Sequence, residues 1–493
     1  MDEMHSKADQ ELEKVISYLS VRGYVIESDA VEALKSLSED LEKIVQNVIE
    51  VKKSSGNDNV IRIQDVTPFI PIKRILTEVA IETEVETVSD PSRNIQPLKP
   101  LEGYSKLFVD RYNKLLSLLR RRPDSKGLTS IGLVGKLSEG SKVKTAGLLF
   151  ARSERKNGVE VTLDDPSGSV RVYFKEALAQ QVLKVPLDSM VMIEGTKVGV
   201  SQILANRVSL PDVPDHKPTV SSHRAYVVLL SDLHIGSKMF LEQDFARFLK
   251  WLNLTDGDED IVSKIKYIII AGDLIDGIGI YPDQEVQLAE REPRKQYAEV
   301  FNLLSKVPNN IRIIISPGNH DMVRQALPQP AIPSDLAQPL YSMDNVTFVG
   351  SPAYLKINGV LFLIFHGRSL DDIIASTPEL SYRRPSEAMK LLLRARHLAP
   401  IYGRRTALSP ESQDMLVIEE LPDVMHCGHV HAFDYQEYKG TLLVNSGTFQ
   451  GQTPFQQNMG LEPTPSIVPI LDLSSLEVIR RSFTLQSSNS ALR

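Results

Sequence analysis

The chain has 493 residues, of which 42% are hydrophobic and 24% charged, and its formal net charge is −7. This length exceeds what one hydrophobic core usually supports, so we expect roughly two to four domains. The sequence lacks the run of roughly 20 apolar residues that a membrane span needs, and its acidic, polar start is unlike a signal peptide. A single cysteine excludes an internal disulfide framework and a cysteine-based zinc cluster. We therefore expect a cytoplasmic protein without a membrane partner, and the negative charge disfavours a protein that binds nucleic acid through a basic surface alone.

Residues 1–53 predict a small helical domain. Apolar side chains recur at helical spacing over 12–19 and again over 34–48. Residues 54–100 lose this periodicity and contain the stretches SSGNDN and SDPSRNIQPLKP, so we expect a linker there. The helical domain carries no chemical motif, and its role stays open between docking and structure.

Residues 101–212 predict one amphipathic helix, over 104–122, followed by a β-barrel. Short runs of alternating hydrophobicity are separated by turn residues, and five strands at this spacing fit an OB-fold. OB-folds bind single strands through exposed aromatic and basic residues. The aromatic candidates here, Phe150, Tyr173 and Phe174, are more typical of a core. Packing against another domain is therefore the favoured role of the barrel.

The chemical motifs lie in the last predicted domain, 225–493, which follows a proline-containing linker over 213–224. In four places a run of Ile, Val and Leu is followed at once by a polar residue able to bind a metal ion. These segments are AYVVLLSDLHIGS, KYIIIAGDLIDGIGIYPDQ, IRIIISPGNHD and VLFLIFHGRS, and a fifth, DVMHCGHVHAF, adds a His-x-His pair. Buried strands with ligands at their carboxyl ends build a crevice, the usual position of an α/β active site.

Seven side chains in these segments are candidate metal ligands: Asp232, His234, Asp273, Asn319, His366, His429 and His431. In Asp-x-His and His-x-His, an extended backbone would send both side chains to the same face, so that each pair could reach one ion. Carboxylate, amide and imidazole ligands without thiolate suit Mn²⁺, Fe²⁺ or Zn²⁺ better than Mg²⁺ alone. Seven ligands are too many for one ion with an open position, and they suit two ions that share a carboxylate.

The order D-x-H, G-D, G-N-H-D, H-G and G-H-x-H resembles the calcineurin-like metallophosphoesterase superfamily. The resemblance implies an α/β fold, a two-sheet sandwich flanked by helices, with two divalent ions, Mn²⁺ being favoured over Fe²⁺, Zn²⁺ or Mg²⁺. It also divides the ligands between the ions. Asp232, His234 and His431 would hold one ion. Asn319, His366 and His429 would hold the other, and Asp273 would bridge the two. His320 would act on the scissile phosphate, with Asp321 as its orienting partner.

The domain order and the stretch GDLIDGIGIYPDQ narrow the resemblance further. Over roughly residues 125–480 they are similar to the small subunits of archaeal family D DNA polymerases. This resemblance implies a 3′→5′ proofreading exonuclease that works with a large polymerase subunit, in a heterodimer or a larger complex. It implies DNA with a single-stranded or frayed 3′ end as the substrate, and it leaves contact with a sliding clamp open. The alternatives are a non-catalytic scaffold subunit and a stand-alone phosphoesterase, because a fold alone does not decide the substrate.

One basic segment lies between the fourth and fifth motifs. Residues 381–405 carry seven basic side chains against a single acid, Glu387. A group of this kind can hold the DNA backbone, dock a partner or simply form a solvated face. The candidates for DNA contact are Arg383, Arg384, Arg394, Arg404 and Arg405.

Overall fold

The computed structural model describes residues 83–254 and 258–484 and, before them, residues 14, 16–27, 31, 45, 46, 48, 49, 52 and 59–62. The chain divides into two units, Met1–Ala80 and Ile81–Arg493. In the first unit, residues 16–21 are helical, and two short strands, β1 (Val25–Ile26) and β2 (Val60–Ile61), pair in parallel. Most of the helical domain predicted for 1–53 lies outside the described residues.

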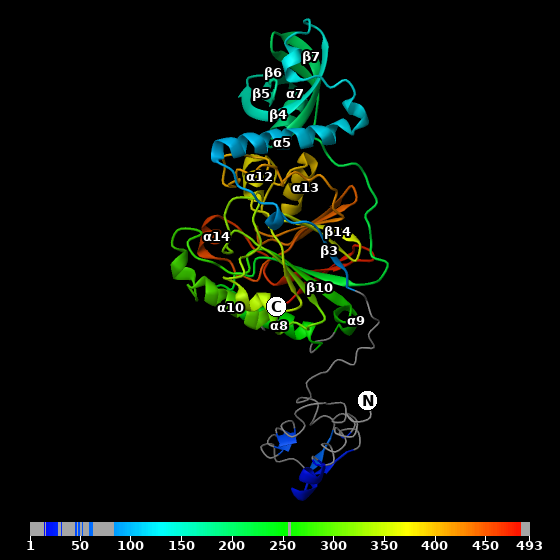
Figure 1. Cartoon of the computed structure of the whole chain (residues 1–493), viewed down its shortest axis with the longest axis vertical. Helices are drawn as coiled ribbons and strands as arrows, with labels where there is room; N and C mark the ends of the chain where they lie inside the picture. Colours follow the sequence, from blue (N-terminus) through cyan, green and yellow to red (C-terminus); the bar gives the residue numbers. More distant parts are fainter. Residues whose placement is uncertain are drawn as a thin grey trace, which may run out of the picture. The chain divides into compact units, whose positions relative to one another are not determined.

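Two six-stranded sheets form the body of the second unit (Figure 1). The first sheet contains, in spatial order, β12 (Val346–Phe348), β11 (Arg312–Ser316), β10 (Ile265–Ala271), β9 (Tyr226–Leu230), β18 (Ile467–Asp472) and β19 (Val478–Ser482). Its strands β9 to β12 are parallel, whereas β18 pairs antiparallel with both of its neighbours. The second sheet contains β16 (Asp434–Tyr438), β17 (Thr441–Asn445), β15 (Val424–Cys427), β14 (Val360–Ile364), β13 (Ala353–Ile357) and β3 (Val85–Ser89).

The two sheets pack face to face, and helices cover the outer face of each. Val227 and Leu229 of β9 point between the sheets and share an apolar layer with Phe362 of β14. Val228 of β9 points the other way, toward α8 (Glu242–Leu252) and α10 (Pro293–Leu304). The outer face of the second sheet packs against α12 (Leu370–Ser376) and α13 (Pro385–Ala395). Because β9, β10 and β11 are buried on both faces, they have continuous apolar sequences without alternation.

A closed five-stranded barrel lies in sequence between β3 and β9. Its strands follow the order β4 (Lys142–Arg155), β5 (Gly158–Asp165), β6 (Gly168–Phe174), β8 (Gln202–Ser209) and β7 (Met190–Gly199), with α7 (Glu176–Leu183) between β6 and β7 in sequence. Phe174 is fully buried, whereas Phe150 is 63% exposed. Phe150 therefore lies outside the core of the barrel, contrary to the prediction.

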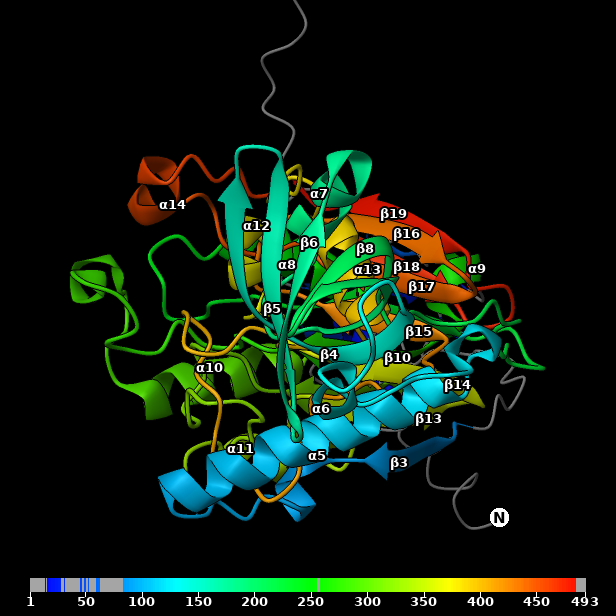
Figure 2. The ribbon, with the colours of Figure 1, turned by 90° about the horizontal axis from the view of Figure 1, so that it is seen from above.

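Helix α5 (Pro100–Arg120) lies between the barrel and the two-sheet body (Figure 1), and the view from above shows it along one side of the barrel (Figure 2). Leu115 and Leu119 pack against barrel residues such as Met192. Arg111 of the same helix pairs with Asp414 of the body, with Nε and Oδ2 2.7 Å apart and both side chains fully buried. The helix is thus anchored on both sides, as expected for a barrel that packs against a neighbouring domain.

The end of the predicted linker, 83–100, is structured rather than loose. Strand β3 pairs antiparallel with β13 as an edge strand of the second sheet. The side chain of Asp90 then accepts hydrogen bonds from the backbone of Ser92 and of Gly350. The sequence VETVS is too short and too polar to predict such a strand. By contrast, every residue of the second predicted linker, 213–224, is described and none lies in a helix or strand.

The remaining elements are short. They are η2 (Pro91–Arg93), η3 (Pro123–Ser125), α6 (Ile131–Val134), α9 (Glu259–Val262), η4 (Gln284–Gln287), α11 (Gln338–Tyr341) and α14 (Pro454–Asn458). None of the described helices has the length and apolar character that a membrane crossing requires. The assignments of the barrel to the OB-fold and of the sheets to the metallophosphoesterase fold stay predictions.

Candidate metal centre

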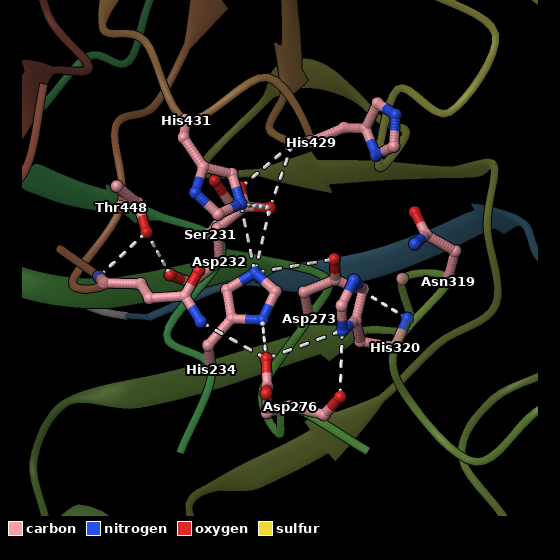
Figure 3. A network of polar contacts seen from close by, with 12 residues as sticks. Ser231, Asp232, His234, Asp273, Asp276, Asn319, His320, His429, His431 and Thr448 are labelled. Atoms are coloured by element: carbon pink, nitrogen blue, oxygen red, sulfur yellow. Dashed lines mark hydrogen bonds and ion pairs between the residues drawn. The ribbon is translucent and has the colours of Figure 1, made fainter. Parts of the chain in front are cut away.

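The seven predicted ligands meet where strands of both sheets end, and Figure 3 labels all of them except His366. Asp232 and His234 follow β9, Asp273 follows β10 and Asn319 follows β11 in the first sheet. His366 follows β14, and His429 and His431 follow β15, in the second sheet. Six of these side chains are buried, and His429 is partly exposed. The crevice predicted at the carboxyl ends of the strands therefore brings together residues from segments far apart in the sequence.

Asp232, His234 and His431 form the first group of converging donor atoms. The Nε2 atoms of His234 and His431 lie 3.0 Å apart. Oδ1 of Asp232 lies 3.4 Å from Nε2 of His431 and 3.9 Å from Nε2 of His234. Three donors at these separations surround one point, as the ligands of a metal ion do.

Asp273 lies between this group and a second one. Its Oδ2 is 3.8 Å from Nε2 of His234 in the first group and 3.2 Å from Nε2 of His366 in the second. Oδ1 of Asn319 lies 3.0 Å from the same His366 nitrogen. The donor atoms of Asp273, His366 and His429 all lie within 4.8 Å of one another. Asp273 thus has the position that a carboxylate shared by two ions requires.

The electrostatics of the site fit bound cations. Burial opposes ionisation of Asp232, but the neighbouring His431 and His234 outweigh it and hold the pKa of Asp232 well below its usual range. Asp273 behaves in the same way, with burial opposed by His366 and His320, and its pKa is also lowered. Burial lowers the pKa of His234, yet the nearby carboxylates of Asp232 and Asp276 raise it to about 10. The buried carboxylates therefore require positive charge, and divalent ions would supply it in place of protons.

The ring nitrogens that face away from the cluster have partners of their own. Nδ1 of His234 contacts Oδ1 of Asp276 at 2.8 Å, and Nδ1 of His366 contacts the carbonyl oxygen of Ala271 at 2.8 Å. Nε2 of His429 lies 3.1 Å from Oδ2 of Asp371. Histidines that bind metals usually use their second nitrogen in this way, and the contact fixes the ring's orientation.

The backbone of the ligand loops is not extended, so the extended geometry expected for the i, i+2 pairs is wrong. Asp232 and His234 have φ of 53° and 51°, and His429 and His431 have 72° and 57°. Residues other than glycine rarely adopt this left-handed backbone conformation, which costs about 1–3 kcal/mol per residue. Neighbouring contacts hold it: the amide of Asp232 donates to the carbonyl oxygen of Gly272 at 2.9 Å. Each pair comes together because its loop coils immediately after the strand.

His320 lies beside the cluster, with Asp276 rather than Asp321 as its partner. Its Nδ1 is 2.8 Å from the carbonyl oxygen of Asp276 and 3.6 Å from that residue's carboxylate. Burial lowers the pKa of His320 to about 4. The prediction that Asp321 orients His320 is wrong, because the carboxylate of Asp321 instead accepts hydrogen bonds from Gly318 N and Tyr297 OH. Successive residues of this tight loop point to opposite sides.

A cavity of about 350 Å³ lies over the cluster and includes His320 in its lining. Arg405 lines it too, together with Arg368, which the sequence did not single out. Asp371 and Phe455 also line it and were missed because no motif marks them, whereas Asp276 and Tyr281 lie within the stretch GDLIDGIGIYPDQ but were not predicted as site residues.

The predicted basic group is dispersed in the structure. Arg383 and Arg384 form exposed ion pairs with Glu462 and Glu387. Arg394 lies 4.0 Å from Asp212. Arg404 lines a separate pocket beside Asp372. Among the predicted DNA contacts, Arg405 is thus the one that reaches the cavity.

Comparison with known proteins identifies the family. Residues 227–435 match the family of B subunits of the DNA polymerases alpha and epsilon. The chain is 38% identical to the DNA polymerase II small subunit of Pyrococcus furiosus over 439 residues, which cover 85% of this chain and 71% of that protein. It is 37% identical to the corresponding protein of Archaeoglobus fulgidus, with 94% of this chain and 96% of the relative covered. For Methanothermobacter thermautotrophicus the identity is 34%, with 96% and 100% covered. With such identities over nearly its whole length, the chain belongs to the small-subunit family of archaeal family D DNA polymerases.

Proposed function

We propose that this polymerase subunit is a two-metal phosphodiesterase that removes nucleotides from the 3′ end of DNA. The observation that carries the proposal is the position of Asp273 between two groups of converging donor atoms. A subunit that served only as a scaffold would not need seven buried or half-buried metal-type ligands around a cavity. The intact set therefore favours catalysis over the scaffold alternative.

The residues present fit two divalent ions, with Mn²⁺ favoured because imidazole and carboxylate ligands are mixed. Asp232, His234 and His431 would hold one ion, and Asn319, His366 and His429 the other, with Asp273 shared. When bound, such a pair lowers the pKa of a water molecule and neutralises charge on phosphate oxygens.

His320 would move a proton during hydrolysis. The carbonyl oxygen of Asp276 can only accept a hydrogen bond. Nδ1 of His320 therefore carries the ring proton and donates a hydrogen bond to that oxygen. Nε2 of the neutral ring carries no proton, so it would accept the proton released by the attacking water and pass it to the leaving 3′ oxygen. The carboxylate of Asp276, 3.6 Å from the ring, favours the protonated form as that transfer begins.

The polymerase context supports DNA as the substrate and a polymerase subunit as the partner. The relatives are named small subunits of DNA polymerase II, so we propose a large catalytic subunit as the partner, in a heterodimer or larger complex. A single-stranded or frayed 3′ end is the proposed substrate, and the activity is proofreading. Contact with a sliding clamp stays a prediction.

Three substrates distinguish the proposal from its alternatives. With Mn²⁺, the full chain should hydrolyse bis-p-nitrophenyl phosphate and shorten a 5′-labelled single strand from its 3′ end, whereas p-nitrophenyl phosphate should be a poor substrate. EDTA and Asp273→Asn should abolish hydrolysis, and Asp335→Asn, at an exposed site, should not. Preference for the mono-ester would favour a stand-alone phosphatase. Inactivity toward every substrate, alone and with the large subunit, would favour a scaffold.

A further inference from the structure

Two aromatic side chains form one wall of the cavity over the metal-binding cluster. The rings of Tyr281 and Phe455 stack, with centroids 5.4 Å apart and an interplanar angle of 25°. The ring of Tyr281 also lies 6.2 Å from that of His320. All three residues line the same cavity. We call Tyr281 and Phe455 the aromatic wall, and it extends outward from the proposed catalytic histidine.

Buried side chains hold the Tyr281 side of the wall in place. Gln296, fully buried on α10, accepts a hydrogen bond from Gly277 N and donates to Gly277 O. Gln284 accepts from Ile280 N and donates to the carbonyl oxygen of Asp276. Gly277 itself has φ of 66°, and a Cβ there would lie 2.3 Å from the carbonyl oxygen of His320. These contacts, made by residues of the stretch GDLIDGIGIYPDQ, fix the position of Tyr281 relative to the metal-binding cluster.

The Phe455 side is tied to the cluster just as directly. Helix α14 has a capping box in which the side chains of Thr453 and Gln456 satisfy each other's backbone amides. The side-chain amide of Gln456 also lies 2.9 Å from Nδ1 of His431, a proposed metal ligand. Of the residues of α14, all of which are described, none is buried, and Phe455 is 46% exposed. Phe455 is therefore not a core residue of this helix. The contact of the neighbouring Gln456 with His431 keeps Phe455 beside the cavity.

Flat apolar faces beside a phosphodiester site fit an unpaired nucleobase. Every base has a face that stacks on aromatic rings without regard to sequence, as a proofreading site requires. In a paired 3′ end the base is held by its partner and by the adjacent base pair, so turning it onto the wall requires a frayed end. The cavity volume, about 350 Å³, is near the lower end of the range of about 300–1,000 Å³ typical of small-ligand sites.

We propose that the aromatic wall stacks a base next to the scissile phosphate and thereby selects single-stranded 3′ ends over paired ones. This inference rests on the proposed nuclease function and adds the determinant of its specificity. Arg368 and Arg405, which line the same cavity, are the cations available to the DNA backbone on this path.

The test compares substrates within each variant of the full chain. The measured quantity is kcat/KM for a 3′-ended single strand divided by that for bis-p-nitrophenyl phosphate, which carries no base. Phe455→Ala and Tyr281→Ala should each lower this ratio by about 5- to 150-fold, the effect of losing one base–aromatic stack. Phe455→Leu should lower it similarly, because leucine keeps apolar contact but has no flat face. Phe455→Trp should keep the ratio. Tyr435→Ala, which removes an aromatic residue that is 47% exposed on β16 and lies outside the cavity lining, is the matched control.

The outcomes separate this inference from the proposed function. Unchanged ratios in both alanine variants, or an equal fall in Tyr435→Ala, would overturn the inference while leaving the nuclease intact. If the wild-type chain hydrolyses neither substrate, the proposed function fails, and a strand with 3′-terminal 2-aminopurine then decides the inference alone. Quenching of its fluorescence by the wild type, lost in Phe455→Ala, would support stacking. The same titration curve for both proteins, or no quenching by the wild type, would overturn it.

Discussion

Asp276→Ala tests how the proposed metal centre is assembled, because this residue would support the first ion without being one of the predicted ligands. Its carboxylate contacts Nδ1 of His234 at 2.8 Å, whereas the ligands proposed for the second ion are not among its hydrogen-bond partners. Loss of such a partner typically weakens metal binding by about 10- to 100-fold, equivalent to about 1.4–2.7 kcal/mol. We therefore expect one of two Mn²⁺ sites to weaken by this factor and the other to keep its affinity. The contact between His320 and the backbone carbonyl of residue 276 survives the substitution.

Calorimetric titration with Mn²⁺ measures both affinities. Asp276→Asn should have a smaller effect than Asp276→Ala, since the amide oxygen can still accept a hydrogen bond from His234. Asp283→Ala, an exposed position on the same loop, is the matched control and should bind like the wild type. Wild-type affinities in Asp276→Ala, or an equal loss at both sites, would refute the reasoning.

Three further predictions follow from charged groups elsewhere. Asp414→Asn leaves the buried Arg111 without its counter-ion and should lower the free energy of unfolding by about 3–5 kcal/mol in urea. Glu462→Gln, at the exposed pair with Arg383, should change it by about 0–1 kcal/mol, and equal effects would contradict this account. Burial and Arg111 lower the pKa of His397 to about 4, against about 6.5 in the unfolded chain. The unfolded chain then binds more protons, so stability should fall as the pH drops from about 6.5 to about 4. His397→Gln should flatten that dependence in urea titrations, and an unaltered slope would exclude the role. Arg405→Ala should weaken oligonucleotide binding and reduce its logarithmic salt slope by about 0.7, whereas Arg404→Ala should not.

The sequence is most informative where structure and chemistry are encoded locally. The run before Asp232 is apolar because β9 is buried on both faces, and its ligand follows at once because the strand ends at the crevice. The same argument applies to Asp273 after β10 and His366 after β14. Each motif could therefore be recognised from its own sequence. The meeting of their side chains was expected because each motif follows the carboxyl end of a buried strand.

Contacts that depend on loop conformation could not be predicted. Asp321 follows His320 directly, yet the tight loop turns it away, while Asp276 reaches the ring from another segment. Asp371 meets His429 across a long stretch of sequence, and no motif marks it. Strand β3 was missed for a related reason: its five residues, VETVS, gain their strand partner only from the distant β13. In each case the partner is set by tertiary structure rather than by spacing.

We propose that a metal centre in this subunit cleaves DNA with His320 as its proton-transfer group. The most direct measurement is degradation of a 5′-labelled single strand by the Mn²⁺-loaded chain and by His320→Ala, with bound Mn²⁺ counted in the same samples. We predict two ions per chain in both proteins, a ladder of 3′-shortened products for the wild type, and loss of most of that activity in the variant. Equal degradation by both proteins, each with its ions bound, would contradict the account.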